Sequence, residues 1–133
     1  MPILERHWEK LTEEHWHKLA ENWLRCIREH GYECTHAHCN RWSQIIVNFG
    51  MFGTPKELWQ FIKRIVAMAE SEAEFEIIAA MPIEYLLGRF GPEYIDRVEA
   101  EVQTNSRLAR AIKDCNQYQM TDEVWERVKA LQN

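Results

Sequence analysis

The stretch from Ile78 to Gly91 most strongly constrains the fold, because it joins the densest apolar run of the chain to marked backbone signals. Pro82 cannot donate a backbone hydrogen bond and crowds the preceding turn, so a helix that reaches it must end or kink. We therefore predict a helix that restarts at Pro82, carries Glu84 as a cap of its first turn and ends at Gly91. Its buried face has apolar residues at i, i+3, i+4 and i+7: Ile83, Leu86, Leu87 and Phe90.

Similar helix signals recur along the rest of the chain. The residues Thr54-Pro55-Lys56-Glu57 combine a capping box with proline at the first helical position. Segment 41–49 has helical spacing, although the apolar run 45–47 alone also fits a strand. We predict an all-α fold, an irregular bundle of about six to seven short-to-medium helices, with stacked helical hairpins as a variant. Further N-cap residues stand before apolar residues at helical spacing: Thr12, Ser71, Asn105 or Ser106, and Thr121.

The length of 133 residues fits one domain with one core. Residues 1–11 lack a long apolar pattern, so we predict an N-terminal arm or short helix there. Residues 12–133 are then a single α-helical domain. The helix starts are irregularly spaced, which does not favour a solenoid of repeats.

Charge and apolar patterning exclude two classes of partner. The chain has 21 acidic and 16 basic residues, a net charge of -5, with the signs interspersed. It therefore lacks the basic footprint of a nucleic-acid-binding protein. No apolar run approaches the roughly 20 residues of a membrane span, and residues 1–6 lack the apolar centre of a signal peptide. We expect a cytoplasmic protein that binds neither nucleic acid nor membranes.

One segment carries possible metal ligands. Cys34, His36, His38 and Cys39 lie in a stretch without periodicity, and Cys26 and His30 are one helical turn apart just before it. Thiolate and imidazole groups of this kind bind tetrahedral Zn²⁺. The spacing is not that of a standard zinc knuckle, so three interpretations remain open: a zinc site, a polar loop with surface histidines and buried thiols, and a reactive thiol.

Catalytic patterns are weak. Glu14 and His17 have the Glu-x-x-His spacing of dimetal bundles, but those sites need a second such pair, which the sequence lacks. Glu84 is assigned to helix capping, because an acid–base role needs a partner that no spacing supplies. The sequence contains no phosphate loop, nucleophile elbow or zinc-protease motif. We therefore assign no catalytic residue. These patterns favour a non-enzymatic protein and leave an enzyme of another kind open, and we expect no cofactor, or zinc if the Cys/His segment binds it.

The chain also resembles a bacterial domain family of unknown function, DUF6869. The resemblance is clearest between Leu58 and Val128 and rests on a run of small residues, proline, glutamate and paired leucines, followed by a tryptophan-centred final helix. It implies a helical domain and assigns no activity. The matching residues are Trp23, Pro55, Trp59, the run 79–87, Gly91 and the run 124–128.

The absence of a catalytic pattern and the acidic composition favour a protein that acts by binding another protein, as a partner subunit, an immunity or inhibitor protein, or an adaptor. The alternative is a metal-binding protein that uses residues 34–39. The oligomeric state does not follow from the sequence. Apolar residues near the two irregular segments are the predicted interface: Trp8, Trp42, Phe49, Met51 and Phe52.

Overall fold

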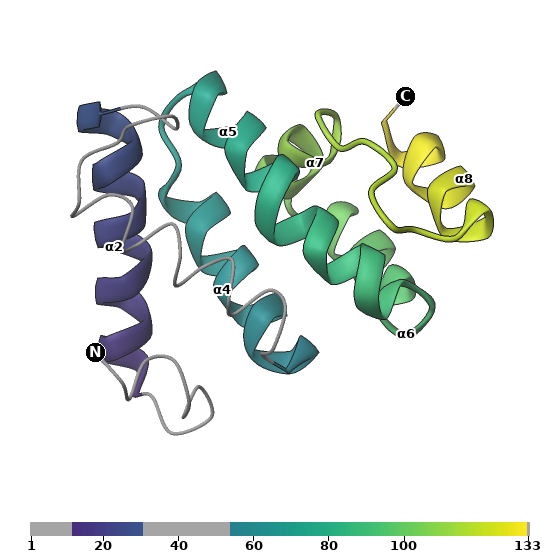
Figure 1. The fold of residues 1–133 in the computed structure, drawn as a ribbon, viewed down its shortest axis with the longest axis horizontal. Helices are drawn as coiled ribbons and strands as arrows, with labels where there is room; N and C mark the ends of the chain where they lie inside the picture. Colours follow the sequence, from purple (N-terminus) through teal and green to yellow (C-terminus); the bar gives the residue numbers. More distant parts are fainter. Residues whose placement is uncertain (1–11, 31–53, 133) are drawn as a thin grey trace. The chain divides into compact units, whose positions relative to one another are not determined.

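The computed structural model describes residues 12–30 and 54–132, all of whose regular elements are helices (Figure 1). The all-α prediction is therefore confirmed. The chain forms two compact units, Met1–Glu70 and Ser71–Asn133, here called unit 1 and unit 2. The prediction of one domain over residues 12–133 stays a prediction, and the arm predicted at 1–11 lies outside the described residues. None of the described helices is long and apolar enough to cross a membrane.

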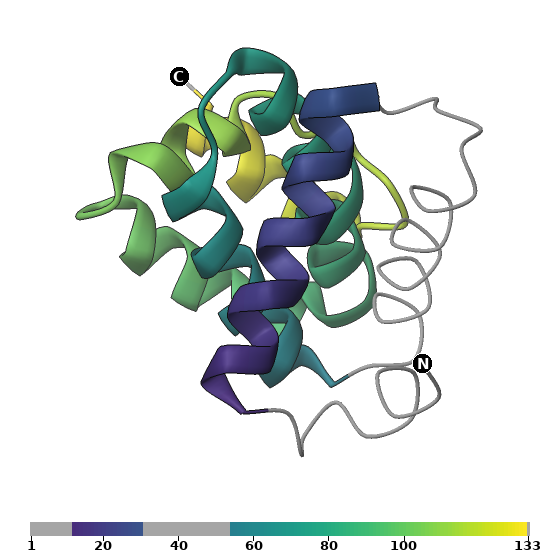
Figure 2. The same cartoon turned by 90° about the vertical axis from the view of Figure 1, so that its left-hand side faces the viewer.

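In unit 1, helices α2 (Glu13–His30) and α4 (Pro55–Met68) lie side by side (Figures 1 and 2). Helix α2 starts where predicted, since the hydroxyl of Thr12 accepts a hydrogen bond from the His15 amide at 3.2 Å. Helix α4 also starts as predicted, with Pro55 in its first turn. The hydroxyl of Thr54 makes no cap hydrogen bond, so that part of the predicted capping box is wrong.

Aromatic rings hold α2 against α4. Phe61, which is 1% exposed, lies 6.2 Å from the ring of Trp16 and 6.0 Å from that of Trp23, both measured between centroids. The rings are tilted by 51° and 57°, within the range of favourable aromatic pairs. The tryptophans of α2 therefore serve packing, as their helical spacing predicts.

Unit 2 begins with one unbroken helical run. Helix α5 (Glu72–Ile78), the π-helix η2 (Ala79–Ile83) and helix α6 (Glu84–Val102) follow each other without a gap. Helices α7 (Ser106–Ile112) and α8 (Asp122–Leu131) complete it. The predicted N-caps are confirmed: the side chains of Ser71, Asn105 and Thr121 each accept a hydrogen bond from the amide three residues later.

The helical run passes Pro82 within the π-helix η2, here also called the π-turn. The predicted restart of a helix at Pro82 is therefore wrong. In this wider turn the Glu84 amide bonds to the Ala79 carbonyl, five residues back. A π-turn is one of the few ways in which a helix accommodates a residue that cannot complete the i to i−4 ladder. Helix α6 likewise continues past Gly91, with non-helical angles at Phe90 (φ −129°, ψ 23°) just before Pro92. The predicted stop is therefore a kink.

The core of unit 2 lies where these helices meet. Gly91 allows a close approach of α6 and α8, because a Cβ there would lie 3.0 Å from a methyl group of Val124. The side chains of Val124 and Val128 are buried, whereas those of Trp125 and Leu131 are only partly buried. Other core residues are Phe75, Ile78, Leu86, Leu87, Ile95, Leu108 and Ile112.

Candidate functional site

The segment 113–121, which joins α7 to α8, is anchored on the π-turn and the first turns of α6. The amide of Asn116 donates a hydrogen bond to the carboxylate of Glu84 at 2.9 Å. The thiol of Cys115 lies 3.8 Å from the Ala79 carbonyl, which accepts its weak hydrogen bond. Gly88 lies so close that a Cβ there would be 2.6 Å from the Tyr118 carbonyl oxygen. We call this segment the α7–α8 loop.

Glu84 is a buried carboxylate, with only 7% of its surface exposed. Burial raises its pKa above the ordinary 4.5, and the hydrogen bond from the Asn116 amide partly opposes this shift. The predicted role as a helix cap is wrong. Because the helical run continues through Pro82, the Glu84 amide is already bonded to the turn before it, and the carboxylate instead fixes a loop 32 residues away.

Cys115 is also buried, with 3% of its surface exposed. Burial raises the pKa of the thiol, and the nearby negative charges of Glu84 and Asp114 raise it further. The thiol therefore stays protonated at neutral pH, and a protonated thiol is a poor nucleophile. The pair of Glu84 and Cys115 holds the loop and does not form a nucleophile with its base.

The tip of the α7–α8 loop carries an exposed aromatic side chain. Tyr118 is 46% exposed, and its ring lies 6.1 Å from the ring of Tyr85 on α6, tilted by 53°. Gln117 donates from its amide to the Met120 carbonyl and to Asp122, both at 3.0 Å. Gln119 has a φ of 60°, a left-handed conformation uncommon outside glycine. We call Tyr85, Gln117, Tyr118 and Asp122 the Tyr118 surface.

The loop is also fixed from the C-terminal end of the chain. The side-chain amide of Gln132 donates to the carbonyls of Ile112 at 3.0 Å and Cys115 at 2.8 Å. Ile112 ends α7, and its carbonyl also accepts a hydrogen bond from the Cys115 amide at 3.1 Å, so Gln132 adds a second donor at the end of this helix. The α7 end of this loop is thus held by two side chains from elsewhere in the chain, those of Glu84 and Gln132.

The predicted zinc ligands Cys34, His36, His38 and Cys39 lie outside the described residues. Of the two further ligands, Cys26 is buried in α2 and His30 is its last residue. Within residues 12–30 and 54–132, no group of three potential ligands is placed to hold a metal ion. Zinc binding by segment 34–39 therefore stays a prediction.

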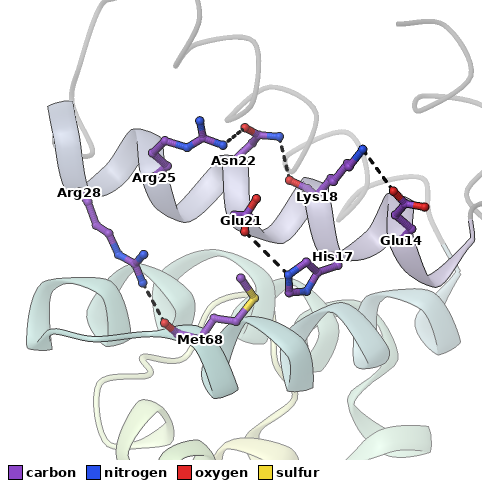
Figure 3. A network of polar contacts seen from close by, with 8 residues as sticks. All are labelled: Glu14, His17, Lys18, Glu21, Asn22, Arg25, Arg28 and Met68. Atoms are coloured by element: carbon purple, nitrogen blue, oxygen red, sulfur yellow. Dashed lines mark hydrogen bonds and ion pairs between the residues drawn. The ribbon is translucent and has the colours of Figure 1, made fainter.

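The Glu14 and His17 pair belongs to an exposed row of ion pairs on α2 (Figure 3). Glu14 pairs with Lys18 at 3.4 Å, and His17 lies 3.8 Å from Glu21. Each therefore has a partner one turn along its own helix, the spacing of weak helix-stabilising pairs.

The C-terminal end of α2 is tied to the end of α4 by an arginine. Arg28 donates a hydrogen bond to the Met68 carbonyl at 2.8 Å, as Figure 3 shows, and lies 3.7 Å from Glu70. A cation next to a last-turn carbonyl is favourable because helix carbonyls there carry partial negative charge. Of the polar contacts drawn in Figure 3, the bond from Arg28 to Met68 joins α2 to α4, and the others lie within α2.

The predicted interface residues Trp8, Trp42, Phe49, Met51 and Phe52 also lie outside the described residues. Neither Tyr118 nor the Asn116 amide was among the predicted site groups. No local pattern indicates them, because the stretch 113–121 has no apolar periodicity. The residues that it contacts, Glu84 and Tyr85, lie far away in the sequence.

The charge of the chain is unevenly divided between its units. Unit 1 has nine acidic and nine basic residues, whereas unit 2 has twelve acidic and seven basic residues. The whole net charge of −5 therefore belongs to unit 2. Such a field attracts cationic partners and repels anionic ones.

Residues 29–133 match the profile of DUF6869, a family of unknown function. No curated protein and no solved structure matches the chain. The matched range contains all of unit 2, including the π-turn and the α7–α8 loop.

Proposed function

For this chain, which belongs to the DUF6869 family of unknown function, we propose a function in protein–protein interaction. The observation that carries the proposal is the concentration of negative charge in unit 2, together with an exposed tyrosine on an anchored loop. Complementary charge increases the rate of association and the selectivity for one partner. We assign the role of a subunit, inhibitor or adaptor that binds a basic protein.

The chemistry of the described polar groups supports binding over catalysis. Glu84 already accepts the Asn116 amide, and Cys115 is held as a neutral thiol. A catalytic carboxylate or thiol instead needs access to a substrate and a group that exchanges its proton. These buried groups fit a structural role beneath the surface that a partner would contact.

The test is reconstitution of a complex from purified components. Proteins that co-purify with the full chain are identified, expressed separately and titrated against it by calorimetry at several salt concentrations. We expect a defined stoichiometry and an affinity that falls as salt rises, because surface charges are screened within about 10 Å at 0.1 M ionic strength. If no co-purifying protein binds the purified chain, the proposed function is wrong.

A further inference from the structure

We propose that the Tyr118 surface is the docking site for an arginine- or lysine-rich segment of the protein partner, with a cationic side chain placed on the ring of Tyr118. The inference rests on the proposed function and names the place and chemistry of binding. Tyr118 is the large hydrophobic residue that is exposed among residues 12–30 and 54–132. Tyrosine is enriched at protein interfaces, where it offers both an apolar ring and a hydroxyl.

The Tyr118 ring is positioned before any partner arrives. The backbone of Tyr118 lies against Gly88, and its ring lies against Tyr85, so α6 supports the residue at two points. The two hydrogen bonds of Gln117 hold the residue before it, and Gln119 behind it keeps a left-handed φ of 60°. Such a conformation is unfavourable outside glycine and persists where surrounding contacts enforce it. A positioned ring loses little conformational entropy on binding.

The loop that carries this ring and the start of α8 are rich in negative charge. The run 114–126 contains four acidic residues and no basic residue. Asp122 is joined to the loop through Gln117, and Asp122 and Glu123 are both exposed at the start of α8. A cation on the face of an aromatic ring is attracted by its π-electrons, and nearby carboxylates add to that attraction. The surface therefore suits an arginine or lysine side chain.

A second copy of this chain is the less suitable occupant. The cationic residues of α7 are Arg107 and Arg110, followed by Lys113 just after the helix, but both arginines are already engaged within unit 2. The guanidinium groups of Arg107 and Arg110 lie 5.5 and 4.6 Å from the ring centroid of Phe75, and Arg110 also pairs with Glu72. Binding through this row would break those contacts, whereas a basic segment of another protein brings its own cations.

The test uses the full chain and a peptide of nine arginines as the probe, followed by NMR of the backbone amides at low salt. We expect the largest shifts at residues 85–89 and 116–123, and an affinity roughly threefold to tenfold lower for Tyr118→Ala, as loss of one cation–π contact implies. Tyr118→Phe should bind as the unchanged chain does, because it keeps the ring. The control Gln103→Ala changes an exposed residue at the end of α6 and should have no effect.

Three outcomes overturn the inference: shifts centred away from the Tyr118 surface, equal affinity of Tyr118→Ala and the unchanged chain, and self-association that Tyr118→Ala abolishes. Amide spectra of each variant establish that it is folded before affinities are compared. The partner found by reconstitution separates this inference from the proposed function. If that partner binds Tyr118→Ala undiminished, the docking site is wrong and the function stands; if no partner exists, the function fails whatever the peptide shows.

Discussion

Replacing Glu84 by glutamine tests two properties of this carboxylate. It holds the α7–α8 loop through the Asn116 amide, and its burial makes the charged form unfavourable. The folded protein holds the pKa of Glu84 above 4.5, so between the unfolded and folded values the native state binds more protons than the unfolded state. The contribution of protonated Glu84 to the free energy of unfolding is therefore complete below pH 4.5. It is lost as the pH rises through the pKa of Glu84 in the folded state. Glutamine does not titrate there, and its carbonyl oxygen can still accept the Asn116 amide.

The expected magnitude follows from proton linkage. The stability of the unchanged chain relative to Glu84→Gln should fall by at most about 1.4 kcal/mol per pH unit within that window and stay constant above it. Keeping a neutral hydrogen bond in place of a charged one changes the pH-independent offset by about 1 kcal/mol. All other titrating groups are shared by the two proteins, so their effects cancel in the difference.

The assay is urea unfolding of both proteins at a series of pH values from 4 to 8. Glu76→Gln, at an exposed position on α5, is the matched control and should change stability by less than about 0.5 kcal/mol. A stability difference that does not depend on pH would refute the reasoning. A rise with pH in the stability of the unchanged chain relative to Glu84→Gln would also refute the reasoning, because that is the behaviour of a carboxylate whose pKa is lowered by folding.

Three further predictions concern other parts of the chain. Phe61→Ala should destabilise the protein by about 3–5 kcal/mol in urea unfolding, whereas exposed Gln60→Ala should change it by less than about 0.5 kcal/mol. Cys115 should resist iodoacetamide in the native protein and react after unfolding, as peptide mass spectrometry can establish; equal rates would contradict its burial. If segment 34–39 binds zinc, untagged protein should contain the metal and melt at a lower temperature with a chelator; metal-free protein whose melting is unchanged would exclude that site.

The helix starts could be predicted because their signals are local. Asn105 and Thr121 each act on an amide three residues later, a distance that the sequence itself displays. The aromatic core of unit 1 was predictable for the same reason, since helical spacing places Trp16 and Trp23 on one face. The assignment to the DUF6869 family agrees with the resemblance inferred from the run 79–87 and the final helix.

The candidate site was less predictable because its contacts join distant residues. Pro82 was expected to separate two helices, but the π-turn keeps the run continuous and leaves Glu84 without free amides to cap. The carboxylate then bonds to the Asn116 amide, a partner that no spacing rule indicates. Tyr118 was overlooked because a lone tyrosine in a polar loop has no periodic pattern.

For this protein, the sequence by itself determined the helical class, the N-caps of most helices and the faces they bury. These properties depend on side chains within four residues of each other. The tertiary structure alone decided how the chain passes Pro82, what Glu84 binds and which aromatic side chain the α7–α8 loop exposes. Those outcomes depend on the approach of α6 to that loop at Gly88, where the absence of a side chain lets two backbones meet.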